Sequence, residues 1–134
     1  FLHSHSYTGN PLSCALAVAT LQLFASENTI ENNRRLSQIM ADAFAHLADH
    51  PHVAEVRQTG MVLAVEMVKD KKSREPFPWQ ERRGLRIYQH GLDNECLLRP
   101  LGNVSYIMPP YVIEESEIRH LAQIATEGIE LATN

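Results

Sequence analysis

The sequence predicts an α+β fold, in which a small, mostly antiparallel sheet carries helices on one side and is preceded by a long apolar helix. Three observations support this class. Apolar residues recur at helical spacing near both ends of the chain, strand-length runs of β-branched and long apolar residues lie between them, and Gly, Pro and Asn separate the runs. The 134 residues suffice for one domain with its own core.

The first two helices are predicted from capping residues and apolar spacing. Asn10 is a good N-cap and Pro11 a good first helical residue, and the residues up to Phe24 are apolar on nearly every face. Such a helix needs protein on all sides. A second, more exposed helix is expected over residues 29–49, because its apolar residues share one helical face and Pro51 follows.

Two strands are expected next, over residues 53–58 and 61–68, with Gly60 between them. The second run is largely apolar on both faces, which predicts a central strand. The charged, proline-containing run over residues 69–78 is expected to form a loop.

The remaining residues predict two helices around a pair of strands. A helix is expected over residues 79–90 and should end at Gly91, and strands are expected over 96–98 and 104–108 with a Gly-Asn turn between them. The closing helix begins among three glutamates, which suit the positive end of a helix dipole. Its buried stripe is expected to comprise Ile118, Leu121, Ala122, Ala125, Ile129 and Ala132.

Charge and composition exclude some classes of function. The net charge is -4 with mixed signs, and no apolar run has the length of a bilayer span, so neither nucleic acid nor a membrane is an expected partner. Cys14 and Cys96 show no pairing framework, which predicts reduced thiols in a cytoplasmic protein. The chain begins at Phe1 without a leader pattern, so we expect it to be part of a longer polypeptide.

Arg99 is the candidate binding residue with the most unusual setting. It lies between two apolar, strand-like runs, next to Pro100 and close to the turn at Gly102. From a strand end, a guanidinium can hold a carboxylate with two parallel hydrogen bonds. The same spacing also suits an arginine that pairs with a nearby glutamate or lies along the surface, so spacing alone leaves both roles open.

The opening residues contain a second candidate site. Ser6 precedes a capped helix, where a hydroxyl and backbone N–H groups can hold a phosphate. A serine near a turn can equally act as a cap or face solvent. His3 and His5, with Cys14 farther on, are a weak signal for zinc because no companion ligands follow at metal-binding spacing. No metal site is predicted.

The run that begins at Arg99 reads Arg-Pro-Leu-Gly-Asn, and the run that begins at Tyr106 reads Tyr-Ile-Met-Pro-Pro. Together with the opening residues, these runs resemble the class III aminotransferases, which use pyridoxal phosphate. The two runs are similar to the biotin-pathway branch of that family, and residues 56–68 fit the same C-terminal region. Ser4 departs from the family pattern, in which a glycine is common. The opening motif matches the family at His3, Ser6, Tyr7, Gly9, Asn10, Pro11 and Leu12.

The resemblance implies a homodimeric enzyme that transfers an amino group from S-adenosylmethionine to 8-amino-7-oxononanoate, giving 7,8-diaminononanoate. Ser6 and Tyr7 would bind the cofactor, and Ser6 would reach the phosphate of the cofactor in the partner subunit. Arg99 would bind the carboxylate of 8-amino-7-oxononanoate, and Tyr106 would line the substrate pocket.

The resemblance also implies how the chain is divided. Residues 1–28 would form a cofactor-phosphate and dimer-contact segment with a connecting helix, and residues 29–134 the C-terminal small domain of a fold-type I enzyme. In the family, the Schiff-base lysine lies upstream of this region. Lys69, Lys71 and Lys72 lie in a charged loop and lack the apolar setting that lowers a lysine pKa, so the isolated chain is expected to be inactive.

Two other functions remain open at the level of the sequence. One is a different class III transaminase that acts on an ω-amino acid, whose carboxylate would also suit Arg99. The other is a non-catalytic binding or assembly module. An upstream lysine region in the same reading frame would distinguish an enzyme from such a module.

Overall fold

The computed structural model describes residues 5–134, which divide into two compact units at Asn32 and Asn33. In the first unit, helix α1 (Pro11–Ser26) begins as predicted: the side-chain oxygen of Asn10 accepts a hydrogen bond of 3.1 Å from the backbone N–H of Ser13. No residue of α1 is buried in this chain. The helix therefore presents an uncovered apolar surface.

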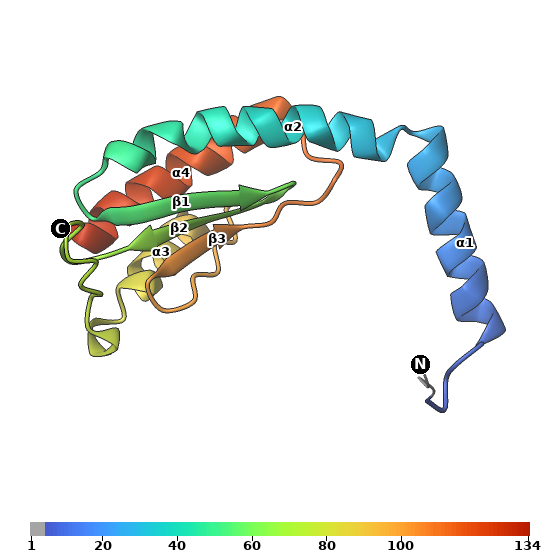
Figure 1. Ribbon diagram of the computed structural model, residues 1–134, viewed down its shortest axis with the longest axis horizontal. Helices are drawn as coiled ribbons and strands as arrows, with labels where there is room; N and C mark the ends of the chain where they lie inside the picture. Colours follow the sequence, from blue (N-terminus) through green and yellow to red (C-terminus); the bar gives the residue numbers. More distant parts are fainter. Residues whose placement is uncertain (1–4) are drawn as a thin grey trace. The chain divides into compact units, whose positions relative to one another are not determined.

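The second unit contains one antiparallel sheet of three strands, drawn in green to orange in Figure 1. The strands are β1 (Val53–Thr59), β2 (Val62–Met67) and β3 (Val104–Ile107), in the order β1-β2-β3. The prediction that the second run forms the central strand is confirmed. Gly60 has a φ of 53°, a conformation that costs glycine little and suits the tight turn between β1 and β2.

Helices cover one face of this sheet, as the sequence predicted (Figure 1). Helix α2 (Thr29–Phe44) continues as a 3-10 turn over Ala45–Asp49, so the expected helical segment ends in a tighter turn. Helix α4 (Glu115–Thr133) closes the chain and packs on α3 (Arg83–Asp93). The largest fully buried side chains are Phe44, Leu36, Met40, Leu47, Leu63, Met67, Ile87, Leu98, Ile118, Ile129, Val53 and Val65.

The other face of the sheet is only partly covered. Leu63 and Val65 of β2 point into the core, whereas Val62 on the opposite face is 42% exposed. On that face, Arg57 forms ion pairs with Glu55 and Glu66 at 3.5 and 2.9 Å. The sequence predicted a strand apolar on both faces, and the structure instead gives β2 one core face and one partly exposed face.

Two predicted elements between residues 79 and 98 are wrong. Arg82 has a φ of 47° and divides the expected helix into a short 3-10 turn, Trp79–Glu81, and α3. Helix α3 also continues through Gly91 to Asp93. Residues 96–98 form no strand, because the backbone N–H of Cys96 donates to the carbonyl of Gly91, which belongs to α3, at 2.8 Å.

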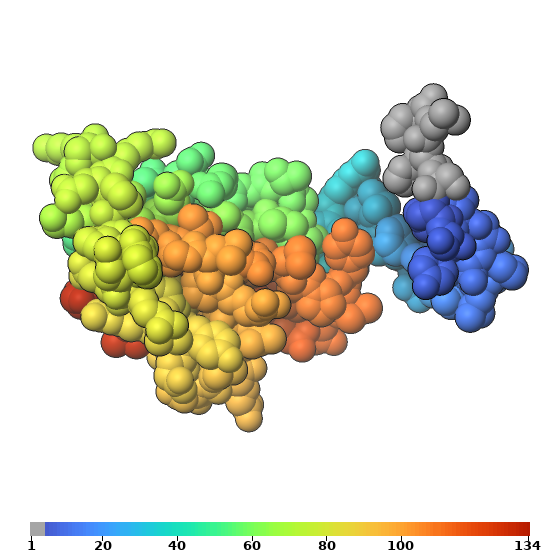
Figure 2. All heavy atoms as spheres, turned by 90° about the horizontal axis from the view of Figure 1, so that it is seen from below, coloured from blue at the N-terminus to red at the C-terminus, as the bar shows by residue number. Residues whose placement is uncertain are grey.

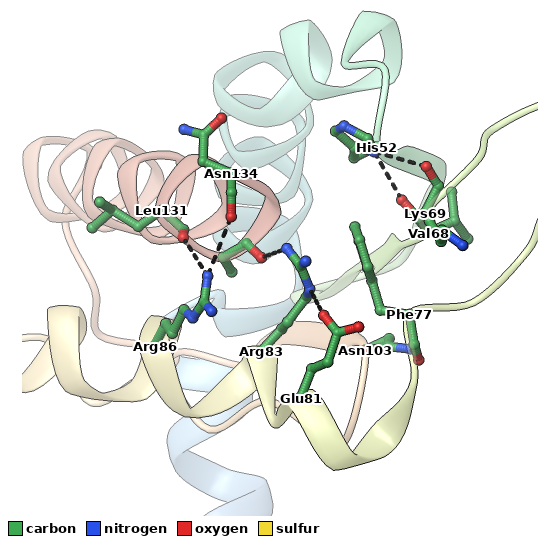
Figure 3. A network of polar contacts seen from close by, with 11 residues as sticks. His52, Val68, Lys69, Phe77, Glu81, Arg83, Arg86, Asn103, Leu131 and Asn134 are labelled. Carbon is green, nitrogen blue, oxygen red and sulfur yellow. Dashed lines mark hydrogen bonds and ion pairs between the residues drawn. The ribbon is translucent and has the colours of Figure 1, made fainter.

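Both ends of α4 are held by charged side chains. At its start, Glu114 and Glu117 form a reciprocal capping box, in which the Glu117 carboxylate accepts from the Glu114 N–H at 2.8 Å. At its end, two arginines of α3 donate to its last carbonyls, as Figure 3 shows. Arg83 reaches the carbonyl of Ala132, and Arg86 reaches those of Leu131 and Asn134. These contacts fix the position of α4 against α3.

Candidate functional site

One cavity of the second unit is lined by both residues that the sequence predicts to bind substrate. Its volume is about 780 Å³, and Arg99 and Tyr106 are among its lining residues. It is bounded by residues 95–99, by β3 with the residues that follow it, and by the first turns of α4. Figure 2 shows the surface of residues 95–99, in gold, next to that of β3 and the residues that follow it, in orange.

Arg99 is exposed at the edge of this cavity and, within residues 5–134, forms no ion pair or hydrogen bond. Two carboxylates, Glu95 and Glu117, line the same cavity. The carboxylate of Glu117 already accepts a hydrogen bond in the capping box of α4. The guanidinium therefore remains available to a carboxylate that enters from outside.

The neighbours of Arg99 in the chain hold its backbone in place. Cys96 and Leu98 are buried in the core, and Pro100 is half-buried. Leu101 forms two backbone hydrogen bonds with Val104 at the start of β3, of 2.8 and 3.0 Å. Burial raises the pKa of the Cys96 thiol, so this sulfur is an apolar part of the cavity wall.

Tyr106 is half-buried on the sheet face that points away from the core. In the strand register it lies opposite Ala64, which in turn lies opposite Arg57, so these three side chains share one face. Its neighbours Ser105 and Ile107 are buried. Tyr106 therefore belongs both to this face of the sheet and to the lining of the cavity.

Apolar side chains supply most of the cavity wall. Such a wall suits the methylene chain of a substrate, and Arg99 at the edge suits its carboxylate. Besides Cys96, the apolar lining residues include Leu98, Ile107, Met108, Pro109, Ile113 and Leu121.

Helix α4 contributes lining residues that sequence reasoning missed. Ser116, Glu117 and His120 of its first turns face the same cavity as Arg99. The sequence indicates the glutamates near this position only as partners of the helix dipole. No local pattern indicates Ser116 or His120 as lining residues, because the tertiary fold brings α4 to this position.

A second cavity, of about 430 Å³, lies beside the first, and Arg99 lines both. Its other lining residues include Trp79, Arg82 and Tyr88. No sequence pattern predicts this cavity, because Arg82 lies at the unexpected break between the 3-10 turn and α3.

Ser6 and Tyr7 belong to the first unit, where they form part of a turn before α1. The turn is closed by backbone hydrogen bonds from Thr8 to His5 and from Asn10 to Tyr7, of 3.0 and 3.2 Å. The side chain of Tyr7 is 79% exposed, and Ser6 is exposed as well. His3 lies outside the described residues.

The lysines lie in settings unlike that of a catalytic lysine. Lys69 pairs with Glu75 at 2.9 Å, and this hydrogen bond raises the pKa of its ammonium group. Lys71 donates to the carbonyls of Ala48 and His50.

Among residues 5–134, no three His, Cys, Asp or Glu side chains gather as metal ligands. In that same range, none of the helices combines the length and apolarity needed to cross a membrane.

Comparison with known proteins gives the family of the chain. The model of the family described as "Aminotransferase class-III" matches residues 2–129. An adenosylmethionine-8-amino-7-oxononanoate aminotransferase from Geobacter sulfurreducens is 40% identical over 99% of this chain. A putrescine--pyruvate aminotransferase from Pseudomonas aeruginosa is 34% identical over 97% of it. The chain spans only 29% and 28% of the lengths of these relatives.

Solved structures agree with this relationship. The adenosylmethionine-8-amino-7-oxononanoate aminotransferase from Methanocaldococcus jannaschii is similar with a TM-score of 0.88 and 38% identity, over 97% of this chain and 30% of that one. An aminotransferase from Vibrio fluvialis in its PMP-bound form has a TM-score of 0.89 and 29% identity, over 98% and 29% of the two chains. Because the family model covers nearly all of the sequence, this chain belongs to the class III aminotransferases.

Proposed function

We propose that this chain is the C-terminal part of a pyridoxal-phosphate-dependent aminotransferase that transfers an amino group from S-adenosylmethionine to 8-amino-7-oxononanoate, giving 7,8-diaminononanoate for biotin synthesis. The observation that carries the proposal is Arg99, which has no partner within residues 5–134 and lies at the edge of a largely apolar cavity. The names of the relatives from Geobacter sulfurreducens and Methanocaldococcus jannaschii support the choice of reaction. We place the enzyme in the cytoplasm, in line with its unpaired Cys14 and Cys96.

The carboxylate of 8-amino-7-oxononanoate binds Arg99 in this proposal. A planar guanidinium fixes both the distance and the orientation of a carboxylate through two N–H···O bonds. The methylene chain then lies along Leu98 and Ile107 on the apolar wall, and Tyr106 contacts it from β3. Binding at the far end in this way sets which carbon of the substrate faces the reacting group.

The residues before α1 fit a phosphate group. Among the described residues the Ser6 hydroxyl makes no hydrogen bond, so it is available as a donor, and Tyr7 offers an exposed ring and hydroxyl beside it. We propose that Ser6 and Tyr7 bind the cofactor. Pyridoxal phosphate, when bound, supplies the electron sink that transamination requires.

We further propose that residues 1–28 form the cofactor-phosphate and dimer-contact segment, and residues 29–134 the small domain. The exposed apolar side chains of α1, which include Leu12, Leu16 and Leu21, suit a helix that is covered in a homodimer of the whole enzyme. A segment shared between two subunits in this way would place Ser6 at the partner's cofactor.

A second substrate class deserves the same assay. Arg99 would also bind the carboxylate of other ω-amino acids, and one relative is named as a putrescine--pyruvate aminotransferase. The test is to assay the full-length protein with S-adenosylmethionine or an ω-amino acid as donor, and with 8-amino-7-oxononanoate or pyruvate as acceptor. Product from the first donor and acceptor supports the proposal. Product from only the second pair would assign the alternative.

Replacing Ser6 by Ala in the full-length protein should weaken cofactor retention modestly. One hydrogen bond to a charged phosphate is lost among several, which costs on the order of 1 to 3 kcal/mol. Equilibrium dialysis against pyridoxal phosphate measures the change, with Ser13→Ala in α1 as the control. Equal cofactor affinity in both variants would remove Ser6 from the cofactor site.

The isolated chain should show no transaminase activity and trap no cofactor on one particular lysine. A lysine that reacts with pyridoxal phosphate must be partly deprotonated, and the ion pair with Glu75 favours the charged form of Lys69. Borohydride reduction after incubation with the cofactor, followed by peptide mass spectrometry, tests this prediction. Stoichiometric labelling of Lys69, Lys71 or Lys72 would contradict it.

A further inference from the structure

The position of Arg99 depends on two glycines of α3. Gly84 and Gly91 are seven residues apart, which is about two helical turns, so they lie on the same side of the helix. Both are buried. Opposite this side runs the segment of residues 96–102, here called the Arg99 segment, in the reverse direction along α3.

The helix and the Arg99 segment touch backbone to backbone at these two glycines. A Cβ atom at Gly91 would lie 2.5 Å from the carbonyl oxygen of Cys96 and 3.1 Å from the side chain of Leu98. A Cβ atom at Gly84 would lie 2.7 Å from the carbonyl oxygen of Gly102. Main-chain carbonyls cannot rotate away as the end of a flexible side chain can, so either methyl group must displace the segment.

Arg99 lies between the two contacts. Leu98, which precedes it, rests on Gly91, and Pro100, which follows it, approaches a Cβ at Gly84 to 3.1 Å. Glycine also lowers the stability of a helix relative to alanine, so two glycines on one face of an 11-residue helix destabilise it. The close approach of the Arg99 segment, which leaves no room for a Cβ atom, accounts for their presence.

We infer that Gly84 and Gly91 are positioning residues, which set the place of the Arg99 guanidinium by letting the Arg99 segment lie directly against α3. This inference rests on the proposed role of Arg99 in binding the substrate carboxylate. Neither glycine touches the substrate. Their effect on the reaction passes through the Arg99 segment, which includes Arg99 and the cavity-lining Leu98, so it should be confined to the substrate that this segment binds.

The test uses Gly84→Ala and Gly91→Ala in the full-length protein, with Gly128→Ala as the matched control. Gly128 lies in α4, where an added Cβ would meet the side chain of Ile87 at 3.3 Å and its Cα atom at 3.4 Å. These distances are longer than those at Gly84 and Gly91, and the contact belongs to the packing of α3 on α4 and involves no atom of the Arg99 segment.

We expect the KM for 8-amino-7-oxononanoate to rise about tenfold or more in both α3 variants, since a displacement of about 1 Å suffices for such a loss. The half-reaction with S-adenosylmethionine should stay within about twofold of the wild type, and Gly128→Ala should change neither value. A KM near that of the wild type in both α3 variants would overturn the inference. An equal fall in both half-reactions would also overturn it.

A second readout does not depend on the reaction. Cys96 begins the Arg99 segment and is buried, so its alkylation by iodoacetamide should be slow. Displacement of the segment should raise the alkylation rate of Cys96 about fivefold or more in Gly91→Ala, and leave it unchanged in Gly128→Ala. Equal rates in all three proteins would contradict the inference.

These readouts separate the inference from the proposed function. If the wild-type protein does not use 8-amino-7-oxononanoate, the proposed function fails, and the alkylation rates still decide whether the glycines hold the segment. If an α3 variant does not fold, Pro100→Ala replaces it, because this change removes the ring that rests on Gly84 without inserting an atom into the helix. A folded Pro100→Ala protein with unchanged KM and unchanged Cys96 alkylation would overturn the inference.

Discussion

Arg99→Ala in the full-length protein should lower kcat/KM for 8-amino-7-oxononanoate about thirtyfold or more, mainly through a higher KM. Removing one partner of a largely desolvated charge pair costs about 2 to 5 kcal/mol. The carboxylate of this substrate is far from the reacting carbon, so the cofactor cannot recognise it. Within residues 5–134, the lining of the 780 Å³ cavity is mainly apolar and offers no arginine or lysine besides Arg99.

The half-reaction with S-adenosylmethionine should be nearly unaffected by this change. Arg99→Lys should restore only part of the loss, because an ammonium group cannot form the two parallel hydrogen bonds of a guanidinium. The control is Arg119→Ala on α4, whose guanidinium is 59% exposed and pairs with Glu115 at 2.8 Å. Steady-state kinetics with both substrates provide the measurement.

Two outcomes would return Arg99 to a surface role. One is an equal fall in both half-reactions, which would indicate a general defect. The other is an alanine variant with near-normal kcat/KM for 8-amino-7-oxononanoate. Arg99 would then resemble an arginine that lies along the surface, which spacing alone also allowed.

Local chemistry made much of the fold predictable. Asn10 and Pro11 mark the start of α1 because capping and a fixed φ act within one turn of the chain. The largely apolar run over residues 61–68 likewise indicated the central strand of the sheet, although only one of its faces lies on the core. In each case the signal and the structure that it predicts lie within a few residues of each other.

The errors arise where distant segments meet. Gly91 has the sequence signature of a helix end, and in the structure it is a point of close contact inside α3. Cys96 and Leu98 have side chains typical of a strand, but the backbone N–H of Cys96 donates a hydrogen bond to the carbonyl of Gly91 in α3. Tertiary contacts therefore overrode local preference at both places.

The candidate site also combines residues that the sequence could identify with residues that only tertiary packing brings there. The setting of Arg99 singled it out in the sequence, and the family resemblance pointed to Tyr106, which lines the same cavity. Ser116 and His120 of α4 could not be predicted, because only packing brings that helix to the cavity. The kinetic tests address the proposed role of Arg99 in binding.

Arg83→Ala should destabilise the second unit by about 2 to 4 kcal/mol, the sum of several contacts made by one largely buried guanidinium. Figure 3 shows Arg83 between Phe77 and the end of α4. Its guanidinium lies 3.9 Å from the centre of the Phe77 ring and pairs with Glu81 at 2.6 Å. It also donates to the carbonyl of Ala132, which would otherwise lose a partner.

Arg86→Ala is the matched control for this prediction. Arg86 lies on the same helix and donates to the last carbonyls of α4 at 3.3 and 3.4 Å, but it is exposed, and water can replace it. We expect its loss to cost less than about 1 kcal/mol. Urea unfolding of the chain, followed by circular dichroism, measures both free energies. Since Arg83 is only 15% exposed and Arg86 is exposed, equal losses in the two variants would show that burial of the Arg83 guanidinium adds nothing to the stability of this junction.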